Sequence, residues 1–179
     1  MGSLMDLDVL FSTQRLSSYK SYEEHRQNLI LIKNISAKIG LIEIVSRNKI
    51  ANLLNITDGK FISHQSFGYW VKELNDNKLH NKLVDFTNID FRKYSKFNIK
   101  FGWRNYQKVK IIYSLLVTIR NRAFHFENLY KTNQTNGKNA PRITTKINKN
   151  IIGIEPNMIE NFINDALECF DKELVNYIK

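Results

Sequence analysis

The residues best suited to chemistry lie close together in the segment "TIRNRAFHFENLY", residues 118–130. His125 can accept or donate a proton, because a histidine titrates near neutral pH. Arg120 presents a permanently charged, planar fork that suits phosphate oxygens. Asn121 can hold an imidazole or a substrate oxygen in place. The same residues also fit a solvated polar face, or a histidine that caps a helix C-terminus, so both interpretations stay open here.

The apolar pattern before this segment predicts the helix that must position it, from about residue 106 to residue 125. Its core-facing positions recur at steps of three and four residues: Val109, Ile112, Leu116, Ile119 and Ala123. The spacing places Asn121, His125 and Asn128 on the opposite side, and Arg120 on the flank with Glu127. The exposed end of the helix would then carry the polar residues.

On one straight helix Arg120 and His125 diverge by about 140°, at roughly 100° per residue. A single regular helix would therefore not direct both side chains at one atom. Convergence requires a looser helix near Phe124, a swing of the long Arg120 side chain, or a second chain.

Most of the remaining chain has helical periodicity. We expect a helix over 22–56, in two pieces with a break near 34–36, and another over 66–74. A last helix is expected to start at Asn157, because Glu160 three residues later resembles a capping box. The polar stretch 131–142 predicts a mobile basic loop, and 143–154 predicts either a short β-hairpin or a loop. The expected fold class is an all-α bundle with this basic loop before its last helix.

The length and composition of the chain predict how many domains it has and what kind of partner it binds. With 179 residues, 42% of them hydrophobic, we expect a single domain over 4–179, residues 1–3 being an expression remnant. The net charge of +10 favours nucleic acid as a partner, with an anionic membrane second. The longest nearly apolar run, residues 111–119, is far shorter than the roughly 20 residues of a membrane-spanning helix, so no membrane partner is expected.

The cysteine and histidine content bears on the compartment and on cofactors. Cys169 is the only cysteine and lies in an apolar setting, which favours a reducing, cytoplasmic compartment and a core position over a nucleophile. His25, His64 and His80 show no metal-ligand spacing. Phosphate-binding glycine-rich loops are not found in the sequence either. We expect no metal and no cofactor.

Four segments together resemble the Abi-like (abortive infection, AbiD/AbiF-type) branch of the HEPN ribonuclease superfamily. "R-N-x-x-x-H" at residues 120–125 resembles the R-x(4–6)-H signature of that superfamily. Beside it, "FSTQRLSSY", "LIEIVSRNKIANLL", "SFGYWVKEL" and "IRNRAFHFENL" resemble family segments in the same order. Phe126 is a departure, because the family pattern H-H-E has a second histidine there. The resemblance covers residues 7 to about 130.

This resemblance implies an activity, partners and a source. HEPN ribonucleases cleave RNA without metal, by attack of the 2′-hydroxyl on the adjacent phosphorus. The resemblance also implies a homodimer whose active site is formed by residues of both copies. Arg120, His125 and Asn121 would be catalytic. The supporting, RNA-binding residues would be Arg122, Glu43, Arg47, Asn48 and Glu127. A bacterial toxin or abortive-infection effector of this kind, acting in the cytoplasm, would need restraint from a protein or RNA antitoxin.

Two simpler interpretations remain beside this one. Glu43 and Arg47 have the i, i+4 spacing of an ion pair on a helix surface. The whole domain can also be a non-catalytic HEPN module that binds RNA or a protein through its basic face. The basic residues of the expected loop would grip RNA phosphates in either case: Lys131, Lys138, Arg142, Lys146 and Lys149.

Overall fold

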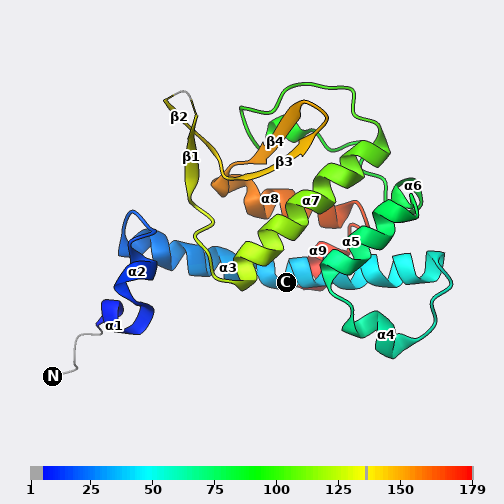
Figure 1. Ribbon diagram of the computed structural model, residues 1–179, viewed down its shortest axis with the longest axis horizontal. Coiled ribbons are helices and arrows are strands. Elements are labelled where there is room, and N and C mark those ends of the chain that lie inside the picture. The colour runs from blue at the N-terminus through cyan, green and yellow to red at the C-terminus, as the bar shows by residue number, and fades with distance from the viewer. Residues whose placement is uncertain (1–5, 136, 179) are drawn as a thin grey trace.

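Two crossing helices form the centre of the protein. The computed structural model describes residues 6–135 and 137–178, so the expression remnant expected at residues 1–3 lies outside the described residues. Helix α3 (Tyr22–Leu53) runs along the whole body, and α7 (Asn105–Phe124) crosses it (Figure 1). A buried 2.6 Å hydrogen bond joins the hydroxyls of Ser46 on α3 and Tyr113 on α7. The predicted apolar stripe of α7 is confirmed, because all five of its residues are fully buried.

The break expected near residues 34–36 is wrong, because α3 is one continuous helix. Ile35 is fully buried and packs into the core at this point. The hydroxyl of Ser36 donates to the carbonyl of Ile32 one turn earlier, so its polarity is satisfied within the helix. Asn34 faces solvent. A polar pair on the outer face therefore costs the helix little, and the inward stripe continues through it.

Shorter helices cover the two central ones. Helices α5 (Phe67–Asp76) and α8 (Ile159–Glu168) pack against α3, and α6 (His80–Leu83) packs against α7. Helix α5 begins where expected, capped by the Ser66 hydroxyl. The remaining helical turns are α1 (Leu7–Phe11), α2 (Thr13–Leu16), α4 (Gly59–His64), η1 (Phe91–Lys93), η2 (Pro156–Met158) and α9 (Leu174–Tyr177). None of the described helices combines the length and apolar character needed to cross a bilayer.

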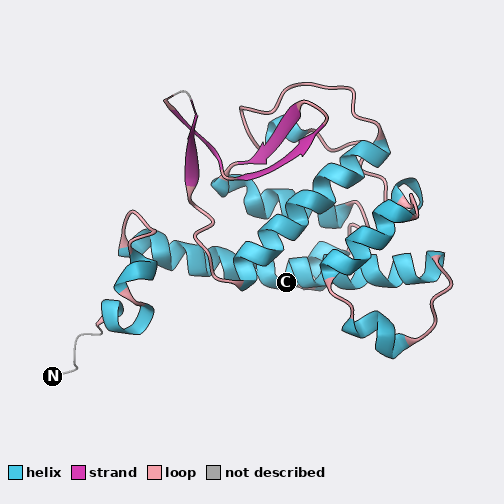
Figure 2. Cartoon of the chain, in the orientation of Figure 1, coloured by secondary structure: helices cyan, strands magenta, loops and turns pink. Residues whose placement is uncertain are grey.

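The expected all-α fold class is wrong, because two antiparallel hairpins lie between α7 and α8 (Figure 2). Of the described residues, 59% are helical and 10% lie in strands. One hairpin pairs β1 (Thr132–Thr135) with β2 (Lys138–Pro141), in the segment expected to be a mobile loop. The other pairs β3 (Ile143–Ile147) with β4 (Asn150–Ile154), so the hairpin alternative holds for 143–154. The fold is helical with hairpins added to one side of α7.

Packing and turn chemistry explain both hairpins. Ile143, Ile152 and Ile154 are buried, and β3 packs against α7. The Asn98 side chain donates to the carbonyl of Gly153 and accepts from its N–H, each at 2.8 Å, so the backbone of β4 is satisfied. In the other hairpin, the sequence Asn-Gly ends at Gly137, which has a φ of 70°. Asn-Gly is a strong hairpin signal, and it was present in the sequence.

The last long helix begins two residues later than expected. Pro156 starts a short 3-10 turn, and α8 follows from Ile159. Glu160 does not complete a capping box. Its carboxylate accepts from Nζ of Lys38 on α3 at 2.7 Å. The acidic residue therefore joins two helices instead of closing the end of one.

Candidate active site

Helix α7 ends in a tight turn immediately before the candidate catalytic histidine. Its last residue is Phe124, and His125 is the C-cap. The N–H of Phe126 donates to the carbonyl of Ala123 at 3.0 Å, and that of Glu127 to the carbonyl of Arg122 at 2.9 Å. This is the Schellman arrangement, in which the residue after the cap is left-handed. The helix therefore ends near Phe124, so Asn128 does not share a helix face with Asn121 and His125.

Phe126 occupies the left-handed position, with a φ of 51°. Glycine or asparagine usually fills such a position, because a bulky side chain is strained there. The Phe126 ring is 49% exposed, so burial offsets only part of this strain. Phe126 also stands where the resembled family has its second histidine. An aromatic ring is thus presented to solvent directly beside His125.

Arg120 is held between α7 and α3. Its Nε lies 3.5 Å from Oε2 of Glu43, an ion pair without a hydrogen bond, and no other described residue accepts a hydrogen bond from this buried nitrogen. The guanidinium lies over the Phe124 ring, 5.1 Å from its centroid. One Nη donates a long, 3.4 Å hydrogen bond to Asn121. Most of the five N–H donors of Arg120 are therefore still available to an anion.

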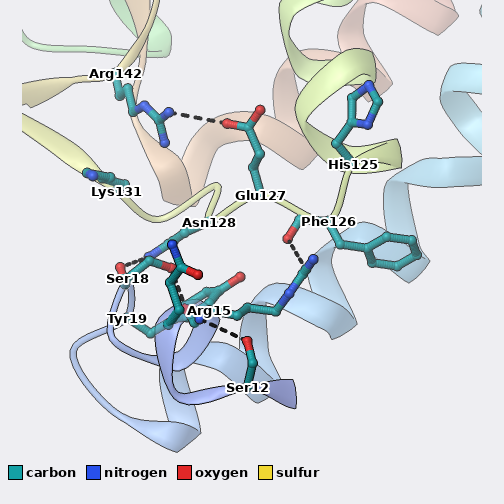
Figure 3. A pocket seen from close by; sticks show the side chains of 11 residues that line it. Ser12, Arg15, Ser18, Tyr19, His125, Phe126, Glu127, Asn128, Lys131 and Arg142 are labelled. Carbon is teal, nitrogen blue, oxygen red and sulfur yellow. Dashed lines mark hydrogen bonds and ion pairs between the residues drawn. The ribbon is translucent and has the colours of Figure 1, made fainter. Parts of the chain in front are cut away.

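His125 does not meet Arg120 within one chain. Its imidazole is exposed and makes no hydrogen bond or ion pair within the described part of the chain. Figure 3 shows the ring at the rim of a pocket, directed away from Arg15 and Tyr19. No hydrogen bond or ion pair among the described residues joins His125 to Arg120, which agrees with the divergence derived from helical spacing.

The N-terminal segment holds the turn that carries His125. Nη1 of Arg15 in α2 donates to the carbonyl of Phe126 at 3.1 Å. Fully buried Asn28 on α3 donates to the carbonyl of Glu127 at 3.1 Å and accepts from the N–H of Leu129 at 2.8 Å. The Asn128 amide donates to the carbonyl of Ser18 at 2.7 Å. A backbone with this many partners keeps His125 in one place relative to α3.

Glu127 joins the turn to the base of the hairpins. Its Oε2 accepts from Nη1 of Arg122 at 2.7 Å. It also accepts from Nη2 of Arg142 at 3.2 Å, as Figure 3 shows. Arg122 and Glu127, both expected to support the site, are therefore brought together. Because the two arginines share one carboxylate, the group keeps a net positive charge.

A pocket of about 430 Å³ opens between this turn and α2. Three cations from separate segments reach it, namely Arg15, Lys131 and Arg142, and Figure 3 shows them around one opening. The other lining residues are Ser12, Gln14, Ser18, Tyr19, His125, Phe126, Glu127 and Asn128. Arg120 and Asn121 do not line it. The structure therefore separates the expected site into an Arg120 group and a His125 group.

Of the three α3 residues expected beside the motif, Glu43 is the one that forms an ion pair with it in the described part of the chain. Glu43 forms its ion pair with Arg120. The predicted surface ion pair between Glu43 and Arg47 is not found among the described residues. The Nε of Arg47 is buried and has no hydrogen-bond partner within residues 6–135 and 137–178. Asn48 is exposed. A role for Arg47 and Asn48 in lining a cleft stays a prediction.

Residues of the N-terminal segment that sequence reasoning did not assign to the site contact it directly. Arg15, Tyr19 and Asn28 belong to the turn or its pocket. A signal was present, because "FSTQRLSSY" contains Arg15 and Tyr19 and resembles the opening segment of the same family. Elsewhere, burial and the nearby Asp165 carboxylate raise the pKa of the half-buried Cys169 thiol, which disfavours a thiolate. The described residues contain no cluster of three or more His, Cys, Asp or Glu side chains suited to a metal ion.

Comparison of the chain with protein-family models, with curated proteins and with solved structures gave no match. The resemblance to the Abi-like HEPN branch therefore stays a prediction that rests on the residues quoted for it.

Proposed function

We propose that this protein is an endoribonuclease of the HEPN type that acts as a toxin or abortive-infection effector. The observation that best supports this proposal is the environment of the two motif residues, Arg120 and His125. Arg120 is held by Glu43 and Phe124, while most of its N–H donors lack partners among the described residues. His125 is exposed on a braced turn, and its imidazole makes no hydrogen bond in the part of the chain that the structure describes. An oriented cation and an uncommitted acid–base group suit phosphodiester cleavage.

The proposed reaction needs no external reagent. The 2′-oxygen attacks the adjacent phosphorus while one His125 takes the 2′-hydroxyl proton. The bond from phosphorus to the 5′-oxygen breaks, and a second histidine gives that oxygen a proton. The products are a 2′,3′-cyclic phosphate and a 5′-hydroxyl. Arg120 would bind the non-bridging oxygens, where negative charge increases in the transition state.

We propose further that the active form is a two-fold homodimer. The reaction uses two proton-transfer groups, whereas one chain supplies one motif histidine, and Arg120 and His125 diverge within the chain. A two-fold axis would bring Arg120 toward the partner's His125 and supply the second histidine. Phe124 and Phe126, which flank His125 in sequence, are 40% and 49% exposed. Exposed aromatic rings beside an incomplete site favour a contact with a second copy.

The test is RNA cleavage by the purified protein in the presence of a metal chelator. We expect His125→Ala to lower the rate by about 10²- to 10⁴-fold, as for a general acid–base group. Arg120→Ala should lower it by about 10²- to 10³-fold. Mass spectrometry of the RNA ends should find cyclic phosphates, and expression of the wild type, but of neither variant, should arrest bacterial growth.

One observation favours a second candidate, a module that binds RNA without cutting it. The two motif residues do not converge in one chain, whereas the cationic pocket is already formed. If wild type and both variants leave RNA intact but bind it equally, the binding module replaces the enzyme.

A further inference from the structure

The pocket beside His125 is built from three parts of the chain that are distant in sequence. Arg15 comes from α2, Lys131 directly precedes β1, and Arg142 lies between β2 and β3. The β1–β2 hairpin projects from the body above this place (Figure 1). The hairpin therefore brings two of the three cations to the turn that carries His125.

The charges of the pocket are only partly neutralised by the protein. Arg15 donates to a backbone carbonyl and has no carboxylate partner among the described residues. Lys131 is exposed and makes no ion pair within the described part of the chain. Arg142 shares the Glu127 carboxylate with Arg122. A pocket with three cations and one shared carboxylate favours an anion.

The shape and donor types identify the kind of anion. The volume of about 430 Å³ lies in the range of pockets that hold part of a nucleotide. Two guanidinium groups and an ammonium group suit the tetrahedral oxygens of a phosphate. The opening is continuous with His125 and with the exposed ring of Phe126. A phosphate bound here would belong to a strand that also passes the histidine.

We propose that this pocket binds a backbone phosphate of the RNA strand, next to the phosphate that is cleaved. The proposal rests on RNA as the substrate in the proposed function. It assigns Lys131 and Arg142 as substrate-binding residues, and Arg15 both as a ligand of the phosphate and as the clamp on Phe126. The subsite would hold the strand so that the neighbouring phosphodiester lies at His125.

Binding can be measured apart from cleavage in the full chain carrying His125→Ala. Fluorescence anisotropy with a short, unstructured oligouridylate gives the affinity at several salt concentrations. In this background Lys131→Gln and Arg142→Gln should each weaken binding about fivefold. Each should also reduce the slope of log affinity against log salt by about 0.7, the value for one lost contact to a single strand. Arg142→Gln leaves Glu127 paired with Arg122, so the turn should stay folded.

Lys60→Gln is the matched control, because Lys60 is an exposed lysine of α4, outside the pocket and at the opposite end of the body from α2 (Figure 1). Equal effects of Lys131→Gln and Lys60→Gln would show general charge attraction and overturn the subsite. Absence of RNA binding by the His125→Ala protein would also overturn it. Adenosine monophosphate should compete only weakly. If it binds as tightly as the oligouridylate, the pocket is a site for a free nucleotide and the proposal is wrong.

The outcomes separate the subsite from the proposed enzyme. If the wild type cleaves RNA but Lys131→Gln and Arg142→Gln bind like their parent, the subsite fails and the enzyme stands. If both variants lose affinity but the wild type leaves RNA intact, the subsite stands and the catalytic proposal fails.

Discussion

The carboxylate of Glu43 lies 3.5 Å from Nε of Arg120, across the contact between α3 and α7. The Glu43 side chain is 16% exposed and that of Arg120 is 33% exposed, so solvent screens this pair less than a surface pair. The pair connects two of the segments on which the proposed relation to HEPN ribonucleases rests. In the proposed reaction Glu43 would have a positioning role, since it orients the Arg120 guanidinium.

We expect Glu43→Gln to lower the RNA cleavage rate by about 10- to 100-fold, because a small displacement of Arg120 is costly in the transition state. In an Arg120→Ala background the same change should have no further effect, since the two residues act together. Glu160→Gln is the control, because it removes an ion pair with another α3 residue, Lys38, that involves no motif residue. Additive effects of Glu43→Gln and Arg120→Ala would contradict the positioning role.

The proposed composite site predicts that one defective copy inactivates the dimer. Co-expression of wild-type and His125→Ala chains with different tags allows the mixed dimer to be purified. That dimer has one His125 where the proposed reaction uses two, so its cleavage rate should fall far below half of the wild-type rate, toward that of the His125→Ala homodimer. If the mixed dimer keeps about half of the wild-type rate, each site is contained within one chain.

Substitutions at Phe126 should affect the stability of the fold and the self-association of the chain differently. Its left-handed backbone costs a residue other than glycine about 1 to 3 kcal/mol. Phe126→Gly should therefore keep the free energy of unfolding within about 1 kcal/mol of the wild type, as measured by denaturant titration of dilute protein. Phe126→Val should be less stable than Phe126→Gly, since a β-branched residue tolerates this conformation poorly. Sedimentation equilibrium should show a weaker dimer for Phe126→Gly, and an unchanged dimer would remove Phe126 from the interface.

Among the residues that hold the turn after His125, Asn28 should contribute most to the stability of the protein. Its fully buried amide donates to Tyr19 and Glu127 and accepts from Leu129. Asn28→Ala should lower the free energy of unfolding by about 2 to 3 kcal/mol, because buried backbone groups lose their partners. Asn52→Ala, an exposed position on the same helix, should change it by less than about 0.5 kcal/mol. Chemical denaturation measures both, and equal effects would show that the turn does not depend on Asn28.

Stability should fall as the pH is lowered, in part through His25. Burial, followed by the nearby Arg15 charge, lowers the pKa of His25 below its ordinary value of 6.5. Below that value the unfolded chain binds a proton more readily than the folded chain, so this contribution is complete above pH 6.5 and decreases below it. His80 adds to the trend, because burial lowers its pKa in the same direction.

Thermal unfolding at pH 8 and at pH 5 tests this linkage, and the interval avoids most carboxylate titration. The decrease in midpoint between the two should be smaller for His25→Gln than for the wild type. His64→Gln is the matched control at an exposed histidine. An equal decrease in all three proteins would remove His25 from the pH response.

Helical periodicity predicted α5 and α7 well, because each has one apolar stripe that must be buried and clear ends. It failed at the polar pair within α3, where an intact inward stripe outweighed two outward polar residues. It also failed at residues 131–142, which form a hairpin, and it left a hairpin and a loop open at 143–154, since short strands gain their stability from packing against α7 and from partners such as Asn98. The Asn-Gly sequence before β2 was a local signal for the first hairpin that the loop interpretation did not use.

For the site, the sequence by itself determined the residue types, the order of the segments and the divergence of Arg120 from His125. Those follow from covalent spacing and from the helical repeat, which act locally. Only the tertiary structure decided that Glu43 belongs to Arg120, and that Arg15 and Asn28 brace the turn beside His125. It also decided that Lys131 and Arg142 meet Arg15 around one pocket. Such contacts join residues about a hundred positions apart, and no local rule of spacing specifies them, because they depend on how the helices and hairpins pack.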